Sequence, residues 1–324
     1  MPNDKIYLEQ IWNEVLVAVK RNFKMIPRQH IWATEIGRPY YDRYLKMLGT
    51  PPTRIIEERV LRKFAAGDIF EELVGQYLSK IGLIQSSQER IEIPADEKHL
   101  KVTGKIDYIA SMPDWYQARK AVDGLEQKNE YDETDITKQI LHKLIDELNA
   151  KYPKGLPPTI FEIKTINSMV FWAKKHYLKE AYPHHVMQLY TYLKAKNLPE
   201  GRIVYLSKDD LTIKEMTVFC PDPILEEKWN TDVTEMSKYL REKTVPPMPD
   251  EIVFDPNGRK IFQKNNVKYK TEGVWKENWE VKFSSYFELI TGTPNEEEWI
   301  NALKPEMKKR NDKLKEEYIK KHNL

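Results

Sequence analysis

The stretch that decides the fold is IFEIKT, residues 160–165. Two prolines, Pro157 and Pro158, end the segment before it, and a short run rich in β-branched and aromatic residues is typical of a buried strand. Side chains alternate between the two faces of a strand, so Glu162 and Lys164 share one face. An acid and an amine are costly to bury unless each has a partner. We expect a divalent metal as the partner of Glu162 and an anionic substrate as the partner of Lys164.

Length and composition are those of a soluble globular protein. The chain has 324 residues, of which 40% are hydrophobic and 31% are charged. No apolar run is long enough to span a bilayer, and the first residues lack the pattern of a secretion signal. We therefore expect a cytoplasmic protein that does not enter membranes. The net charge is only +2, so a nucleic-acid surface would have to be local.

Apolar periodicity predicts both helices and strands. Helices are expected over residues 4–24, 55–82 and 183–196, strands over residues 90–94, 100–110 and 160–165, and a closing hairpin over residues 202–219. We predict an α/β fold whose central mixed β-sheet is flanked by helices. The expected divisions are an N-terminal helical region (1–54), a core (55–220) with an insertion (111–157), and a C-terminal extension (221–324). The last helix is charged on nearly all faces, which favours solvent or a protein partner.

Four groups of polar residues follow one another along the chain. They are an acid on a helix (Glu71), Gly-x-x-Asp on a strand (Gly104 and Asp107), Glu-x-Lys on the next strand (Glu162 and Lys164) and Gln-x-x-x-Tyr on a helix (Gln188 and Tyr192). Magnesium prefers hard oxygen ligands and keeps several waters. Asp107, Glu162 and the backbone carbonyl of Ile163 would supply one edge of such a shell. Glu71 would hold a second ion or a water.

The other members of these groups supply charge and hydrogen bonds. Lys164 is a point charge that can orient a water and offset charge developing on a phosphate. Gln188 and Tyr192 are one helical turn apart, so they share a face and are expected to bind the DNA backbone or to brace the metal ligands. Arg38 and Tyr41 lie in a stretch that interleaves basic and aromatic residues, which suits either a surface that grips a nucleic-acid strand or a packing helix.

The order of these motifs resembles that of the PD-(D/E)XK nuclease superfamily, in its RecB-like branch with a Gln-x-x-x-Tyr motif. The similarity covers about residues 30–220, and the matching motifs are GDIFEE (67–72), GKID (104–107), EIKT (162–165) and QLYTY (188–192). A single Glu-x-Lys is common by chance, but four motifs in order are more specific. The resemblance implies a restriction-endonuclease-like core. It also implies a DNA nuclease that depends on Mg²⁺ or Mn²⁺ and acts as an exonuclease or in end processing.

The chain departs from the family pattern in two respects. The CRISPR-adaptation nucleases of this branch often have His where this chain has Glu71, which instead resembles the acid of the λ-exonuclease branch. Many relatives also carry four cysteines around an iron–sulfur cluster, whereas this chain has only Cys220. We therefore expect no iron–sulfur cluster, and a packing core of Trp279, Phe283 and Tyr286 in its place.

Each motif also has a simpler explanation. Asp107 alone suits the end of a strand, and Glu162 with Lys164 suits a plain ion pair across a strand. Glu72 is an alternative to Glu71 as the helical acid. The alternative function is a catalytically inactive DNA-binding or assembly protein on the same fold. We favour the nuclease, because an inactive relative has no physical reason to keep three costly buried charges.

Overall fold

The structure is a computed structural model, and it describes residues 8–20, 26–54, 56–80, 82–112, 114–125, 134–172, 178–264 and 266–322. The chain forms two compact units. The first comprises Met1–Phe23, Gln29–Arg38 and Glu57–Arg241, and the second comprises Lys24–Arg28, Pro39–Ile56 and Glu242–Leu324. This division differs from the predicted one, because residues 39–56 group with the C-terminal residues and residues 221–241 group with the core.

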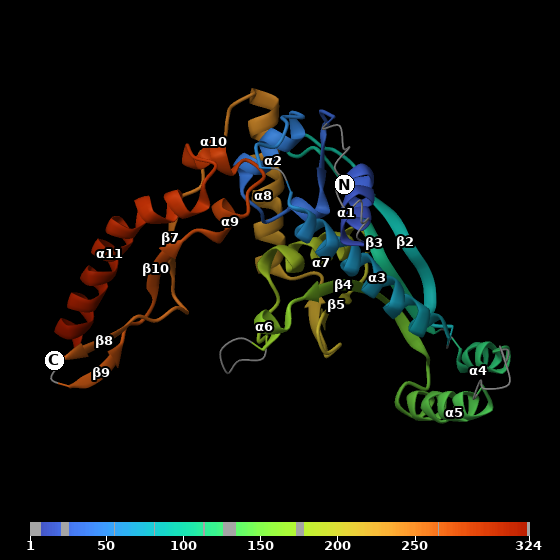
Figure 1. The fold of residues 1–324 in the computed structure, drawn as a ribbon. Helices are drawn as coiled ribbons and strands as arrows, with labels where there is room; N and C mark the ends of the chain where they lie inside the picture. Colours follow the sequence, from blue (N-terminus) through green and yellow to red (C-terminus); the bar gives the residue numbers. More distant parts are fainter. Residues whose placement is uncertain are drawn as a thin grey trace, which may run out of the picture. The chain divides into compact units, whose positions relative to one another are not determined.

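A six-stranded mixed sheet forms the centre of the first unit (Figure 1). Its strands are β1 (His30–Trp32), β2 (Ile84–Ile93), β3 (Lys101–Met112), β4 (Leu156–Ile166), β5 (Glu200–Ser207) and β6 (Ile213–Phe219). They run in the order β1-β3-β4-β5-β6, and β2 also pairs with β3. The β1–β3 and β4–β5 pairs are parallel, and the other pairs are antiparallel. The predicted mixed sheet is confirmed.

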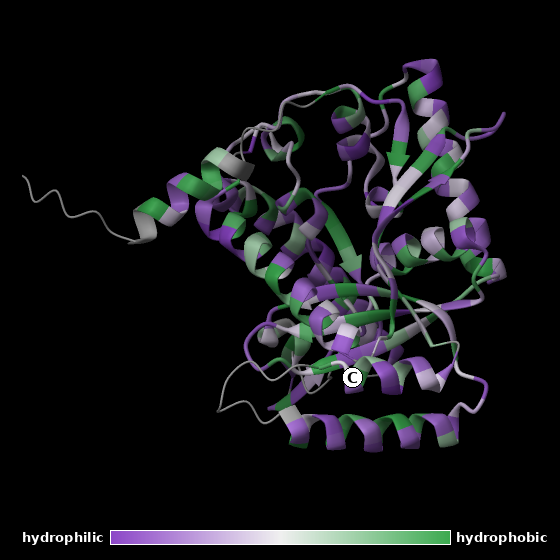
Figure 2. Ribbon diagram, turned by 90° about the vertical axis from the view of Figure 1, so that its right-hand side faces the viewer, coloured by the Kyte–Doolittle hydropathy of each residue, from purple (hydrophilic) through white to green (hydrophobic). Residues whose placement is uncertain are grey.

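Helices flank this sheet, as predicted. They are α1 (Leu8–Lys20), α3 (Glu58–Lys80), α6 (Ser168–Phe171), α7 (Pro183–Lys196) and α8 (Pro223–Glu242), with the short 3-10 helix η1 (Ala33–Glu35) after β1. Helix α3 packs against β2, β3 and β4, and α7 packs against β4, β5 and β6. Hydrophobic and hydrophilic residues alternate along the helices (Figure 2), as helices with one buried face require.

The two edges of β3 are used differently, and this difference creates an opening in the sheet. Along one edge, β2 pairs with residues 102–110. Along the other edge, β1 pairs with residues 101–103 and β4 pairs with residues 108–112. A strand has only two edges, so residues 104–107 face none of the described strands on this second side. The predicted motif GKID occupies this opening.

Helix α7 fills part of the opening. Tyr192 of α7 is fully buried against β3 at this point. Gly104 makes room for the same ring, because a Cβ there would lie 2.6 Å from Tyr192 Cε1 and 3.0 Å from Ala33 Cβ. This close approach gives a physical reason for glycine at position 104.

We expect Gly104→Ala to lower the free energy of unfolding by about 1–3 kcal/mol, because the added methyl group would overlap the buried Tyr192 ring. Thermal unfolding of the purified protein measures this loss. Gly124→Ala is the matched control, since a Cβ at Gly124 meets nothing closer than 3.5 Å and its φ is −75°. Equal melting temperatures for the two variants would contradict the close packing of Gly104 on Tyr192.

The insertion between β3 and β4 is a pair of helices at the end of a hairpin. The two strands are antiparallel, and their pairing extends to Met112 and Leu156, close to the predicted limits of the insertion at residues 111 and 157. Between them lie α4 (Trp115–Asp123) and α5 (Thr134–Lys151), which pack on each other around a small hydrophobic core of their own. The insertion is therefore a pair of helices carried at the end of the β3–β4 hairpin.

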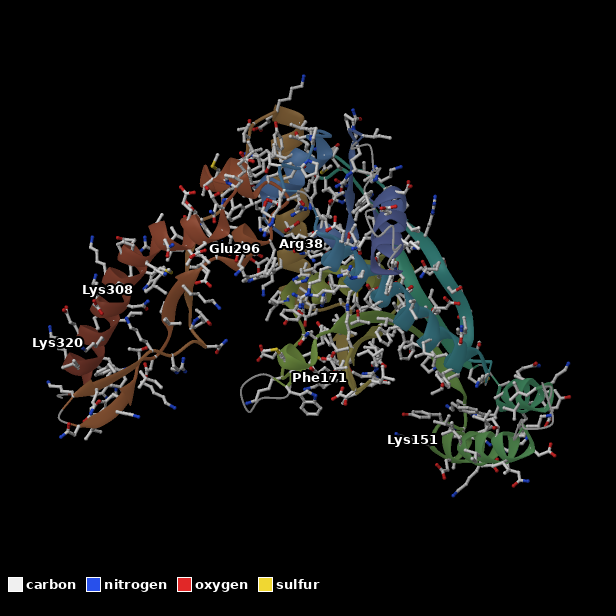
Figure 3. The ribbon with its side chains drawn as sticks, in the orientation of Figure 1. Arg38, Lys151, Phe171, Glu296, Lys308 and Lys320 are labelled. Atoms are coloured by element: carbon white, nitrogen blue, oxygen red, sulfur yellow. The ribbon has the colours of Figure 1, made fainter. Side chains whose placement is uncertain are left out.

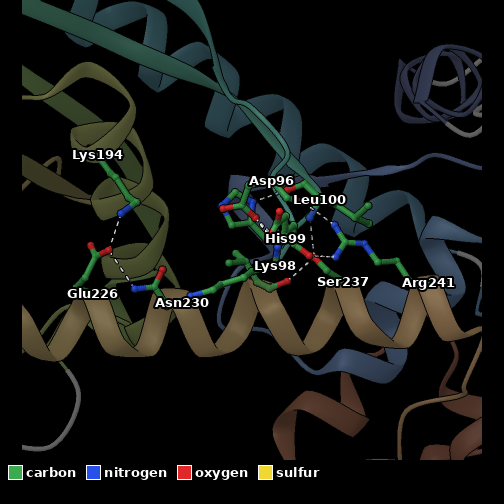
Figure 4. A network of polar contacts seen from close by, with 11 residues as sticks. Asp96, Lys98, His99, Leu100, Lys194, Glu226, Asn230, Ser237 and Arg241 are labelled. Atoms are coloured by element: carbon green, nitrogen blue, oxygen red, sulfur yellow. Dashed lines mark hydrogen bonds and ion pairs between the residues drawn. The ribbon is translucent and has the colours of Figure 1, made fainter.

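Helix α8 belongs to the first unit because its side chains bind the core. Trp229 Nε1 on α8 donates a hydrogen bond to Thr191 Oγ1 on α7 at 3.0 Å. Further along the helix, the Arg241 guanidinium donates to the carbonyls of Asp96 and Glu97, in the loop between β2 and β3. Figure 4 shows Arg241 and Asp96 as part of a polar network along the helix. They explain why the predicted boundary at residue 221 does not separate two units.

The second unit combines α2 (Tyr40–Met47) with the C-terminal elements. These are β7 (Ile252–Asp255), β8 (Ile261–Lys264), β9 (Val267–Lys270), β10 (Val274–Glu277), α9 (Trp279–Lys282), α10 (Phe287–Thr291) and α11 (Glu296–Lys321). Its hydrophobic core contains Tyr41, Val281, Phe287, Ile290 and Trp299. The aromatic side chain of Tyr41 therefore packs among C-terminal residues, which is why residues 39–56 do not group with the N-terminal helix.

The packing core expected in place of an iron–sulfur cluster is only partly present. Tyr286 is fully buried, and its hydroxyl donates to the Thr50 carbonyl at 2.9 Å. Trp279 and Phe283 are 42% and 70% exposed, so this part of the prediction was wrong. Residues four apart share a helix face, and at α9 this face points outward while Val281, on the other side, is buried.

Helix α11 is the charged C-terminal helix that the sequence predicts. It packs against β10, and its Lys308 and Lys320 side chains, labelled in Figure 3, are exposed. Binding of a protein partner through this helix stays a prediction. None of the helices in the described part of the chain combines the length and the apolar character needed to cross a membrane.

Candidate functional site

Residues of all four predicted motifs line one cavity in the first unit. The cavity has a volume of about 710 Å³. Its lining includes Glu71, Asp107, Glu162, Ile163, Lys164, Gln188 and Tyr192. It lies where the pairing of β3 with β4 ends, at Tyr108 and Phe161. Side chains distant in sequence meet there because the two strands separate.

Glu162 is the most deeply buried acid of the cavity, with an exposed fraction of 1%. Its Oε1 atom accepts hydrogen bonds from Lys164 Nζ and from Gln188 Nε2, both at 2.5 Å. Its Oε2 atom is buried and has no hydrogen-bond partner among the described residues. Burial raises the pKa of Glu162, although the charge of Lys164 opposes the shift. A buried carboxylate oxygen without a partner is costly, and a cation would remove that cost.

Asp107 uses its side chain to bridge the opening between β3 and β4. Its Oδ2 atom accepts a hydrogen bond from the backbone amide of Ile163 at 2.8 Å. Burial, together with the charge of Glu162, raises the pKa of Asp107 to about 7. Because a positive charge favours the ionised form of a carboxyl, a bound cation would lower this pKa again.

Lys164 places a positive charge beside the two most buried acids of the cavity. Burial alone would lower the pKa of Lys164, but the charges of Glu162 and Asp107 outweigh it, so the pKa is raised. The amine is therefore protonated at neutral pH. Its ion pair with Glu162 agrees with the simpler explanation, in which the two side chains only neutralise each other. That explanation leaves the second Glu162 oxygen buried without a partner among the described residues.

Glu71 reaches the cavity from α3, whereas its neighbour Glu72 does not line it. Gln88 donates a hydrogen bond to the Glu71 carboxylate. Burial and then the charge of Asp107 raise the pKa of Glu71. Glu72 is exposed and accepts a hydrogen bond from Gln76 of the same helix. Of the two acids left open by the sequence, Glu71 is the one placed to act in the cavity.

Gln188 and Tyr192 hold the acids in place. Gln188 Nε2 donates to Glu162 Oε1 at 2.5 Å and to the Tyr192 hydroxyl at 3.0 Å. Both side chains are buried, with exposed fractions of 5% and 0%. This arrangement favours the bracing role over direct contact with DNA.

If the cavity holds Mn²⁺ as the sequence predicts, Tyr192→Phe should raise the Mn²⁺ concentration needed for half-saturation by about 10–100-fold, because groups that orient metal ligands have effects of this size. Tyr190→Phe is the matched control. Tyr190 lies on the same helix and is also buried, but its hydroxyl donates to Glu226 at 2.7 Å, away from the cavity. A normal Mn²⁺ requirement in Tyr192→Phe would contradict the bracing role.

Two of the predicted nucleic-acid contacts are not found at the cavity. Arg38 belongs to the first unit but does not line the cavity, and its Nε atom donates to the Thr34 carbonyl at 3.2 Å. Figure 3 labels its position. Tyr41 is 7% exposed in the core of the second unit. For Tyr41 the packing alternative therefore fits better than contact with DNA.

The adjacent histidines His184 and His185 are half-buried and lie outside the cavity. Burial, followed by the charges of Arg38 and Lys164, lowers the pKa of His184 to about 4. Burial and the neighbouring His184 lower the pKa of His185 to about 2. The His185 Nδ1 atom lies 2.8 Å from the Tyr205 hydroxyl, and neither imidazole lines the cavity.

The predicted site left out several residues of the cavity wall, among them Trp32, Arg90 and Lys105. Lys105 lies two residues before Asp107 on β3, so strand alternation already placed it on the same face. Trp32 lies on β1, which has only three residues and is too short to show a periodicity. Its position at the cavity depends on pairing with β3, which is a contact distant in sequence.

The donor set fits a hard divalent cation that takes few protein ligands. In the described part of the chain, no three acidic, histidine or cysteine side chains are grouped so that they could hold a metal ion together. Magnesium, however, is usually bound by one or two carboxylates and keeps several waters. Asp107, the unpartnered oxygen of Glu162 and the Ile163 carbonyl are such a set, with Glu71 nearby.

No protein-family model matches the chain, and no curated protein matches it. Among solved structures, one described as the crystal structure of SSO0001 is similar, with a TM-score of 0.40 and 16% sequence identity. The similarity covers 74% of this chain and 93% of that chain. A similarity this weak carries no argument about family or activity, so the function has to be argued from the site.

Proposed function

We propose that this protein is a deoxyribonuclease that uses Mg²⁺ or Mn²⁺ to hydrolyse DNA phosphodiester bonds. The observation that carries the proposal is the buried Oε2 atom of Glu162, which has no partner among the described residues and lies in the same cavity as Asp107. Carboxylate and carbonyl oxygens are the ligands that these two metals prefer. Asp107, Glu162 and the Ile163 carbonyl would hold the ion, and Glu71 would hold a second ion or a water.

A bound divalent cation would supply positive charge beside the phosphate and lower the pKa of an attacking water. The protein itself supplies a second positive charge, on Lys164. The ammonium group of Lys164 lies 2.5 Å from Glu162 Oε1. When a phosphate enters the cavity, this group can donate to a phosphate oxygen and offset the negative charge that develops there.

The walls of the cavity suit a nucleic-acid backbone. Arg90 of β2 and Lys105 of β3 are register partners, and both are exposed and line the cavity. Two cations fixed side by side on a sheet are suitable partners for successive phosphates. The preference for exonuclease or end-processing action rests on the family resemblance.

The proposal is tested by incubating the purified protein with end-labelled linear duplex, linear single strands and closed circular DNA. We expect degradation of linear DNA that requires Mg²⁺ or Mn²⁺, stops with a chelator and is abolished in Asp107→Ala, because this variant lacks one of the two carboxylates that hold the ion. Closed circular DNA should persist. A wild-type protein that is inert in Mn²⁺ would contradict the nuclease. If that inert protein and Asp107→Ala bind DNA equally, the catalytically inactive DNA-binding protein is the better account.

A further inference from the structure

Trp32 is a large aromatic side chain at the cavity that the proposed chemistry does not use. It ends β1, lines the cavity and is 47% exposed. Its indole Nε1 donates a hydrogen bond to His30 Nε2 on the same strand at 2.8 Å. The polar edge of the ring is therefore bonded within the protein, while nearly half of the side chain faces solvent beside a polar, charged site.

The sheet register places Trp32 on the same face as the site. Trp32 pairs with Thr103 of β3, and Lys105 of β3 pairs with Arg90 of β2. Register partners share a face, and so does every second residue of a strand. One face therefore carries Trp32 beside Thr103, then Lys105 beside Arg90, and then Asp107. All of these residues line the cavity.

The spacing of these rows matches a short length of nucleic acid. Thr103 and Asp107 are four positions apart on β3, which is about 13 Å along a strand. Successive nucleotides of a stacked strand are about 3.4 Å apart, and further apart when the strand is stretched. The ring of Trp32 thus lies a few nucleotides from a phosphate at the cation that Asp107 is proposed to hold.

We propose that Trp32 stacks on a base of unpaired DNA whose backbone passes Lys105 and Arg90 to reach Asp107. This inference rests on the proposed nuclease function and names its substrate class, which is a single strand or a frayed end. Aromatic side chains stack on bases of any sequence, but the bases inside a duplex are covered by their neighbours. The acid in the same row, Glu92, is paired with Lys101 at 3.2 Å, so its charge is offset.

Binding in the absence of divalent metal tests this proposal without turnover. The probe is a fluorescein-labelled oligodeoxynucleotide, used as a single strand and as a duplex of the same sequence, and the readout is fluorescence anisotropy. Wild type should bind the single strand more tightly. Trp32→Ala should weaken single-strand binding by about tenfold, the size seen when a stacking residue is removed, with little change for the duplex. Trp32→Phe should retain most of the affinity, because a phenyl ring also stacks.

Trp12→Ala is the matched control, because Trp12 is 49% exposed on α1 and does not line the cavity. Equal single-strand affinities of Trp32→Ala and Trp12→Ala would overturn the proposal. An abasic nucleotide at the stacking position should weaken wild type and have no further effect in Trp32→Ala, as expected when both changes remove one contact. The affinities do not depend on cleavage, so failure of Mn²⁺-dependent hydrolysis would remain a separate result.

Discussion

Replacing Lys164 with methionine should reduce the rate of DNA hydrolysis by about 10²–10³-fold, the loss found when a charge-stabilising donor is removed from a catalytic site. Methionine keeps the length and volume of the side chain but cannot offset charge on the phosphate. Mn²⁺ should still bind, because the methionine sulfur does not compete with the Glu162 oxygens for a hard cation. Single-turnover rates at saturating Mn²⁺ measure the effect.

The matched control is Lys194→Met. Lys194 forms an ion pair with Glu226 at 2.5 Å, the same length as the Lys164–Glu162 pair, but it lies outside the cavity. The control removes an equally short ion pair and should leave the rate unchanged. A Lys164→Met protein as active as Lys194→Met would show that the Lys164–Glu162 pair is only structural.

The metal-free protein should lose stability as the pH rises through the range in which Asp107 ionises. The pKa of Asp107 is about 7 in the folded protein, against an ordinary value of 3.8, because the side chain is buried beside Glu162. The folded protein therefore holds this proton more tightly than the unfolded chain does. The free energy of unfolding then falls between about pH 4 and about pH 7, by an amount of the order of a few kcal/mol.

Asp107→Asn removes this titration, and its amide oxygen can still accept the Ile163 hydrogen bond. At pH 8, without metal, Asp107→Asn should therefore melt several degrees above wild type, and the difference should vanish near pH 4. Addition of Mn²⁺ should raise the melting temperature of wild type but not of Asp107→Asn. Asp135→Asn, a change at an exposed acid of α5, is the control. A pH-independent difference between wild type and Asp107→Asn would contradict the account.

The residues of the candidate site could be found from the sequence because their patterns are local. Strand alternation places Glu162 and Lys164 on one face, and helical spacing places Gln188 and Tyr192 on one face. These relations depend only on the local secondary structure and not on the tertiary fold. The central sheet was predictable for the same reason, since its strands show their own alternation.

The features that the sequence did not reveal depend on contacts between distant segments. Tyr41 packs near Trp299 in the core of the second unit, so no pattern around residues 39–56 reveals which unit they join. The exposure of Trp279 and Phe283 depends on which side of the four-residue helix α9 meets the core. The opening in the sheet depends on β1 and β4 sharing one edge of β3.

The division of roles between neighbouring acids also required the structure. Glu71 and Glu72 are adjacent and chemically alike, and only the direction of α3 places Glu71 in the cavity. The same is true of the two Glu162 oxygens. The sequence identifies the carboxylate, whereas the packing around it leaves Oε2 without a partner among the described residues.

The central claim is that Asp107 and Glu162 together hold a divalent cation beside Lys164. The most direct measurement is an anomalous difference map from crystals soaked in Mn²⁺, for wild type and for Asp107→Asn. The account predicts a peak in wild type in contact with both carboxylates, and its loss or strong weakening in the variant. A wild-type map with no peak between Asp107 and Glu162 would contradict it.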